Sequence, residues 1–171
     1  GYEAAVIFSD GTYDEIDLRY VNDDSVSSVS DVPDGWYSYT VNSSGRYSLE
    51  SADDDDVVED DDVDVRSGYA RFVEDNREFT ATRSTVFVVY DEDDYDYDVY
   101  TGYNDVPDVT YAAVVSAINN SSGYAIAVVI TLDESSTATG GGGTSSDFIL
   151  AYDYNGASVD SEGVRYYSYD A

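Results

Sequence analysis

The sequence predicts an all-β protein, built from two antiparallel modules of the sandwich or barrel type. Helical periodicity is almost absent, whereas short alternating runs recur about every ten residues between turn clusters. The apolar residues are mainly Val, Ile, Tyr and Phe, which favour strands. Of the 37 acidic residues 28 are Asp and 9 are Glu, and Asp suits turns better than helices.

The first expected strands lie in the N-terminal third of the chain. Residues 4–8 run into a Ser-Asp-Gly turn, and residues 12–20 then alternate between apolar and polar side chains. Residues 36–41 and 46–49 flank the sequence Asn-Ser-Ser-Gly, which predicts a hairpin with a four-residue loop.

The same pattern continues to the C-terminus. Residues 109–118 are the one stretch that could instead form a helix, and residues 155–163 are expected to be a turn. The expected strands of this part are 67–73, 77–81, 85–90, 95–103, 109–118, 124–132, 147–153 and 164–169.

Two low-complexity segments suggest where the modules separate. Residues 53–64 are an acidic run interrupted by three Val, and residues 140–143 are four Gly in a Ser/Thr-rich loop. We expect a small N-terminal β module at 1–50, an acidic linker or loop at 51–64, and a larger C-terminal β domain at 65–171.

A short repeat raises the question of internal duplication. Both prolines lie in the tetrapeptide Asp-Val-Pro-Asp, at 31–34 and 105–108, and a turn containing Ser-Ser-Gly follows each copy. An old duplication and a chance match in a biased composition both explain this.

The charge and the missing residue types exclude many functions. The formal net charge is −30, all seven basic residues are Arg, and there is no His, Cys or Met. Thiolate, imidazole, haem and zinc-finger chemistry and disulfides are therefore excluded. Nucleic-acid binding needs clustered Lys and Arg. With seven basic residues in the chain, we expect no nucleic-acid partner. No apolar run is long enough for a transmembrane helix, so we also expect no membrane insertion.

The charge itself has several explanations. An Asp-rich surface without Lys suits high salt, carboxylates suit Ca²⁺, and an ordered carboxylate array could mimic DNA. A solvated, mutually repelling surface explains the charge equally well.

Three acidic clusters are the candidate metal ligands. None fits an EF-hand loop, because Val occupies the position that requires Gly, so any Ca²⁺ site would be assembled from several loops or subunits. The candidates are Asp53, Asp54, Asp55, Asp56, Asp60, Asp62, Asp64, Asp91, Asp93, Asp94 and Asp96.

Other patterns are weaker. Paired carboxylates could serve a glycosidase, but 37 acidic residues supply such pairs by chance, and we expect no enzyme. Tyr alternates with Asp or Ser at 95–98 and 37–39, which indicates either a contact face or ordinary half-buried strand residues. Asn42, Asn119 and Asn120 each begin an Asn-x-Ser glycosylation pattern in an expected turn.

Six stretches of the chain together carry a resemblance to a known family: 35–49, 79–82, 85–89, 100–107, 123–130 and 166–169. They resemble the β-rich region outside the S-layer-homology domains in cell-surface proteins of clostridia-like Gram-positive bacteria. The resemblance implies an extracellular, non-enzymatic surface module and supplies no catalytic residues. The helical S-layer-homology domains themselves are not in these residues.

Two functional hypotheses follow. The first is a subunit of a bacterial surface layer or filament that associates with itself through strand edges and Tyr-rich faces, with cations screening its charge. Residues 1–8 and 164–171 are then the segments expected to exchange between subunits. The second is an adhesin-like module that uses Ca²⁺ to bind a carbohydrate or a protein.

Overall fold

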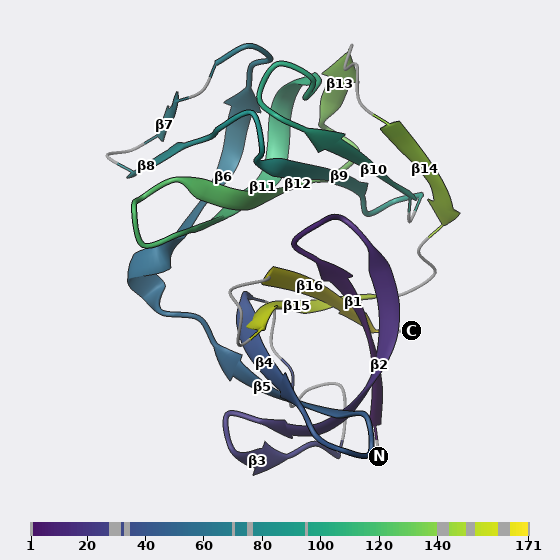
Figure 1. The fold of residues 1–171 in the computed structure, drawn as a ribbon. Coiled ribbons are helices and arrows are strands. Elements are labelled where there is room, and N and C mark those ends of the chain that lie inside the picture. Colours follow the sequence, from purple (N-terminus) through teal and green to yellow (C-terminus); the bar gives the residue numbers. More distant parts are fainter. Residues whose placement is uncertain are drawn as a thin grey trace. The chain divides into compact units, whose positions relative to one another are not determined.

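The computed structural model describes residues 2–27, 32, 35–69, 71–74, 77–94, 96–139, 144–149, 153–160 and 165–170. Over these residues the chain forms β-strands and one short 3₁₀ turn, with no α-helix in the described part (Figure 1). The prediction of an all-β chain is confirmed. Backbone contacts divide the chain into a first unit, Gly1–Asp53 with Ala151–Ala171, and a second unit, Asp54–Leu150.

The first unit is a ring of paired strands. Pairing runs in the order β1-β16-β15-β4-β5-β2, and β2 pairs back onto β1, which closes the ring. β3 pairs with the end of β2 beyond the ring, and each of the six ring strands pairs with two neighbours. The strands are β1 (Tyr2–Phe8), β2 (Tyr13–Val21), β3 (Asp24–Ser25), β4 (Tyr37–Val41), β5 (Arg46–Ser51), β15 (Asp153–Asp160) and β16 (Arg165–Asp170).

Alternating side chains build the core of this unit. Ala4 and Val6 of β1, Ile16 and Leu18 of β2, and Leu49 of β5 all lie in one buried cluster. The residues between them on β2 and β5 are partly or fully exposed. A strand places successive side chains on opposite faces, so this alternation is what the sequence pattern predicts.

The second unit is an open sheet. Its order is β13-β11-β12-β9-β10-β14, and β6 pairs with the other edge of β11. β7 and β8 form a separate hairpin. The elements are the 3₁₀ turn η2 (Asp54–Asp56), β6 (Val57–Val65), β7 (Arg71–Glu74), β8 (Arg77–Thr80), β9 (Val86–Asp91), β10 (Asp96–Thr101), β11 (Asp108–Asn119), β12 (Ala125–Leu132), β13 (Thr137–Thr139) and β14 (Thr144–Ile149).

The apolar strands β9 and β12 lie at the centre of this sheet and pair in parallel. Consecutive residues are buried, including Phe87 and Val88 on β9 and Val128, Val129 and Ile130 on β12. Strands buried on both faces have continuous apolar runs instead of alternation. The same explanation holds for the end of β11, so residues 109–118 are a strand and not a helix.

The unit boundaries differ from those expected from the sequence. Residues 51–64 are not a linker, because most of them form β6, whose Val63 and Val65 are buried in the core of the second unit. The C-terminal strands belong to the first unit, because β15 pairs with β4 and β16 pairs with β1. Part of the expected turn at 155–163 lies in strand β15, and the expected Gly loop at 140–143 lies outside the described residues.

The two units contain the same four-strand arrangement. The order β4-β5-β2-β3 in the first unit corresponds to β11-β12-β9-β10 in the second, with the same antiparallel hairpins and the same central parallel pair. Each Asp-Val-Pro-Asp repeat precedes the corresponding strand, and its Val32 or Val106 is buried in the core of its own unit. These correspondences favour duplication over chance.

A backbone hydrogen bond also recurs at the end of the central strand. The N–H of Asn22, after β2, donates to Leu49 at 2.8 Å, and the N–H of Glu92, after β9, donates to Leu132 at 3.1 Å. In the first unit the turn to β3 is the pair Asn22-Asp23, with φ of 51° and 68°. Two left-handed residues suit a tight two-residue hairpin, and Asn and Asp tolerate that conformation best after Gly.

Candidate functional site

The eleven candidate metal ligands are spread over separate segments. Asp53 precedes η2, and Asp54, Asp55 and Asp56 form it. Asp60, Asp62 and Asp64 lie on β6. Asp91 ends β9, Asp93 and Asp94 lie in the following turn, and Asp96 begins β10. Within the described residues, no group of three or more Asp or Glu side chains is arranged to hold a metal ion.

Several of these carboxylates have structural partners instead. Asp91 Oδ1 accepts the backbone N–H of Asp93 at 3.0 Å and of Asp94 at 3.3 Å, which shapes the β9–β10 turn. Asp64 Oδ2 lies 3.3 Å from Arg66 Nη2, and Asp64 Oδ1 accepts the N–H of Tyr111 at 3.0 Å. These bonds give Asp91 and Asp64 roles in shaping the fold.

The β9–β10 turn does bring carboxylates from two loops near one another. Burial raises the pKa of Glu92, and the negative charges of Asp133, Asp93 and Asp91 raise it further. Hydrogen bonds from Ser135 lower the pKa of Asp133. Asp133 belongs to the loop after β12, and sequence spacing gave no reason to group it with residues 91–94.

The bulge at Tyr111 is the most unusual backbone feature of β11. Tyr111 has φ of 54°, a left-handed conformation that costs a non-Gly residue about 1–2 kcal/mol. The pairing of β11 with β6 shifts register between Val109 and Ala112, so the bulge contains Tyr111. Side chains on both sides hold it: Asp64 accepts its N–H, and the Ser136 hydroxyl donates to its carbonyl at 2.6 Å.

The bulge presents an aromatic ring to solvent. Tyr111 is 60% exposed, although a Tyr in a regularly paired strand of this sheet can bury its ring, as Tyr90 of β9 does at 2% exposure. Tyr69 in a turn and Tyr124 after a hairpin tip are also exposed, at 64% and 47%. The exposed Tyr rings found here therefore come from turns and a bulge.

The Tyr residues of the alternating runs mostly face inward. Tyr37 and Tyr97 are buried, and Tyr39 packs on Tyr47 with ring centroids 5.1 Å apart. Tyr95 lies outside the described residues. Of the two interpretations of these runs, ordinary strand Tyr fits Tyr37, Tyr39 and Tyr97.

An open groove lies on the outer face of the first unit. Its volume is about 400 Å³, within the usual range of ligand sites. The ring of Tyr20 is held by the guanidinium of Arg19, 4.8 Å from its centroid. The lining residues are Tyr20, Asp23, Ser38, Tyr39, Thr40, Ser48, Leu49 and Glu50.

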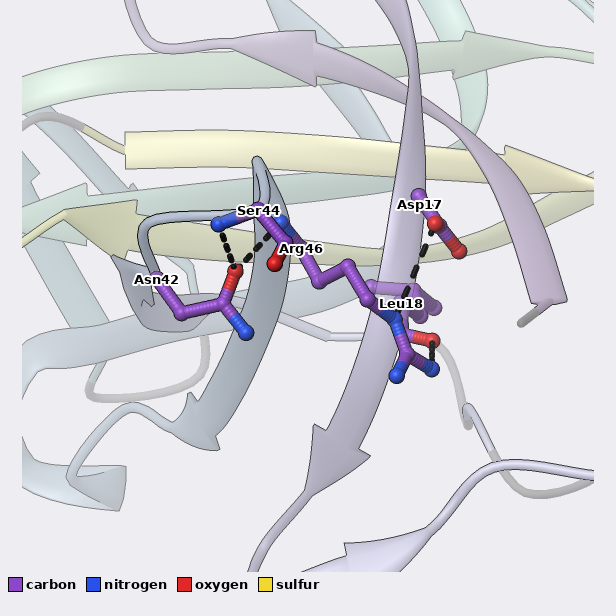
Figure 2. A network of polar contacts seen from close by, with 5 residues as sticks. All are labelled: Asp17, Leu18, Asn42, Ser44 and Arg46. Atoms are coloured by element: carbon purple, nitrogen blue, oxygen red, sulfur yellow. Dashed lines mark hydrogen bonds and ion pairs between the residues drawn. The ribbon is translucent and has the colours of Figure 1, made fainter.

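The hairpin tips are a second surface feature that both units share. In each, one Asn side chain organises the four-residue loop Asn-Ser-Ser-Gly, as Figure 2 shows for Asn42. The hairpin β4–β5 with this loop was predicted from the sequence and is confirmed.

The chain matches no protein-family model, no curated protein and no solved structure. Within the described part of the chain, none of the elements is a helix with the length and apolar character needed to cross a membrane.

Proposed function

We propose that this protein is an extracellular structural subunit that associates with copies of itself into a bacterial surface layer or filament. The contacts are exposed Tyr rings and strand edges, and cations or high salt screen the carboxylates. The protein is not an enzyme in this proposal. The surface location comes from the sequence resemblance, and the mode of association comes from the second unit.

The exposed bulge at Tyr111 is the observation that carries the proposal. A Tyr at this φ costs folding free energy, and two side chains outside the bulge hold the backbone in place. The ring gains little from the fold in return, since it is 60% exposed. Tyr is enriched among the residues that contribute most to protein interfaces, so contact with a second copy explains the cost.

The open edge of the second unit supports the requirement for screening. Among the described strands, β6 pairs through one edge with β11, and its sequence Val-Val-Glu-Asp-Asp-Asp-Val-Asp-Val places carboxylates along the strand. Charged residues on an edge strand oppose pairing with another chain. Two copies of this chain, each with a net charge of −30, therefore associate only where ions reduce the repulsion.

Sedimentation of the Tyr111→Ser variant tests this function. We expect the wild-type chain to form large assemblies in concentrated salt, and Tyr111→Ser to shift the distribution toward single chains. Tyr111→Phe, which keeps the ring, is the matched control and should assemble like the wild type. Equal assembly by all three proteins would show that Tyr111 is not part of the contact between copies.

The groove of the first unit favours a second candidate function, a carbohydrate-binding module of the adhesin type. Two Tyr rings, two Ser and one Thr hydroxyl, and two carboxylates line it, and these groups suit a sugar with several hydroxyls. Calorimetric titration with saccharides, with and without Ca²⁺, tests this candidate. Saturable binding that Glu50→Gln abolishes would favour it over a purely structural role.

A further inference from the structure

The structure separates the three Asn residues that begin a glycosylation pattern. Asn119 is 9% exposed within β11, where it pairs with Ala125 of β12. Asn42 and Asn120 lie at the tips of the two corresponding hairpins, where Asn42 is partly exposed and Asn120 is exposed. Exposure therefore distinguishes patterns that are equivalent in the sequence.

The side chain of Asn42 is fixed in a defined orientation. Its Oδ1 accepts the backbone N–H of Ser44 at 3.0 Å and of Arg46 at 2.9 Å (Figure 2). The Arg46 side chain extends away from the tip, since its Nη2 donates to the Leu18 carbonyl at 3.3 Å and its Nε lies 3.7 Å from Asp17 Oδ2. The guanidinium therefore does not cover the Asn42 amide.

Asn120 repeats this arrangement. Its Oδ1 accepts the N–H of Ser122 at 2.9 Å and of Tyr124 at 3.0 Å. In both loops the Gly has a left-handed backbone, with φ of 79° at Gly45 and 84° at Gly123. A Cβ added at either Gly would meet no atom within 4 Å beyond its chain neighbours, so both tips are open.

The amide nitrogens of these two side chains remain available. Every hydrogen bond that the described residues make with the Asn42 and Asn120 side chains goes to Oδ1. A glycan replaces one hydrogen on Nδ2, so it leaves both Oδ1 bonds and the turn intact.

We propose that Asn42 and Asn120 are N-glycosylation sites and that Asn119 is not. The donor is a saccharide linked to a lipid through phosphate or pyrophosphate. The bond from sugar C1 to the donor phosphate oxygen breaks and the phosphate leaves with the electron pair. A C1–Nδ2 bond forms, and the proton lost by the amide goes to the released phosphate or to solvent. The proposal rests on the proposed function, because the modification occurs on chains that leave the cytoplasm.

Peptide mass spectrometry of the chain, recovered from the surface of the cells that make it, measures occupancy at each Asn. Ser44→Ala and Ser122→Ala remove the acceptor pattern of Asn42 and Asn120 and keep both Asn side chains. Each should abolish the sugar mass at its own site alone. The matched controls are Ser43→Ala, which leaves the Asn42 pattern complete, and Ser121→Ala, which removes the Asn119 pattern alone. Neither control should change occupancy at Asn42 or Asn120.

Surface chains that carry no sugar at Asn42 and Asn120, or that carry it at Asn119, would overturn the glycan proposal and leave the structural function standing. Chains found only inside the cell would overturn the proposed surface location together with the modification. Because these substitutions are at exposed tips, their unfolding midpoints should match that of the wild type, which separates lost acceptor chemistry from lost folding.

Discussion

Single residues in this chain are constrained by backbone geometry more than by chemistry. Gly102 has φ of 85°, and a Cβ placed there would lie 2.8 Å from the carbonyl oxygen of Arg83. Gly45 has a similar φ but open space around it. Gly45 is therefore required for its backbone conformation alone. Gly102 is required both for its conformation and because no space is left for a Cβ.

These requirements predict different costs for the same substitution. Gly45→Ala should lower the free energy of unfolding by about 1 kcal/mol, because Ala disfavours positive φ. Gly102→Ala should lower it by about 2–4 kcal/mol, because the backbone of residue 83 must also move. Denaturant titration of both variants measures the difference, and equal losses would contradict the close contact at Gly102.

Glu92 should respond to pH and salt. Its pKa is raised by burial and by Asp133, Asp93 and Asp91, so the ionised form destabilises the folded state. The penalty is present above the folded pKa and disappears as pH falls below the unfolded value. Glu92→Gln should therefore raise the free energy of unfolding by roughly a few tenths of a kcal/mol at neutral pH and low salt.

The gain from Glu92→Gln should fade in concentrated salt and at acidic pH, where the wild-type carboxyl is protonated. Glu3→Gln, an exposed carboxylate of the first unit, is the control for a general reduction of charge. Equal stabilisation by both variants would show that the local carboxylates around Glu92 have no specific effect.

At the level of elements, the acidic sequence of β6 is the reason that a linker and not a strand was expected there. Residues 51–64 were expected to be a linker because acidic runs are usually solvated. The few apolar positions are sufficient, since Val63 and Val65 enter the core. Asp64 between them and the other acidic residues of β6 remain partly or fully exposed. The bulge at Tyr111 could not be predicted from the sequence either, because no local sequence pattern marks where a strand gains a residue.

Val63→Ala tests whether β6 is a structural strand. Removing two methyl groups at a position 7% exposed should lower the free energy of unfolding by about 1–3 kcal/mol. Asp61→Asn, at a neighbouring exposed position of the same strand, should change it by less than about 0.5 kcal/mol. If Val63→Ala leaves the free energy of unfolding unchanged, residues 57–65 behave as a linker and not as a core strand.

Local patterns predicted the strand content and several hairpins, because alternation and turn residues act over a few neighbours. They could not predict that β15 and β16 return to β4 and β1, since this pairing joins the two ends of the chain. The segments expected to exchange between subunits thus pair within one chain. Alternation likewise could not tell that Tyr37 and Tyr97 face the core, because it does not specify which face is buried.

For the whole molecule, the net charge of −30 opposes both folding and contact between copies through repulsion among like charges. Within the described residues no three or more carboxylates are grouped to hold a metal ion. In the function proposed above, cations act by screening the many dispersed carboxylates. A salt series with and without Ca²⁺ distinguishes general ionic strength from a specific Ca²⁺ requirement.

Sedimentation velocity across a salt series, with EDTA or with Ca²⁺ at each ionic strength, tests the central claim of ion-dependent self-assembly. We predict single chains in dilute buffer with EDTA and large assemblies in concentrated salt. Electron microscopy should show the assemblies as sheets or filaments. Single chains under every condition, at concentrations typical of a cell surface, would contradict the structural function.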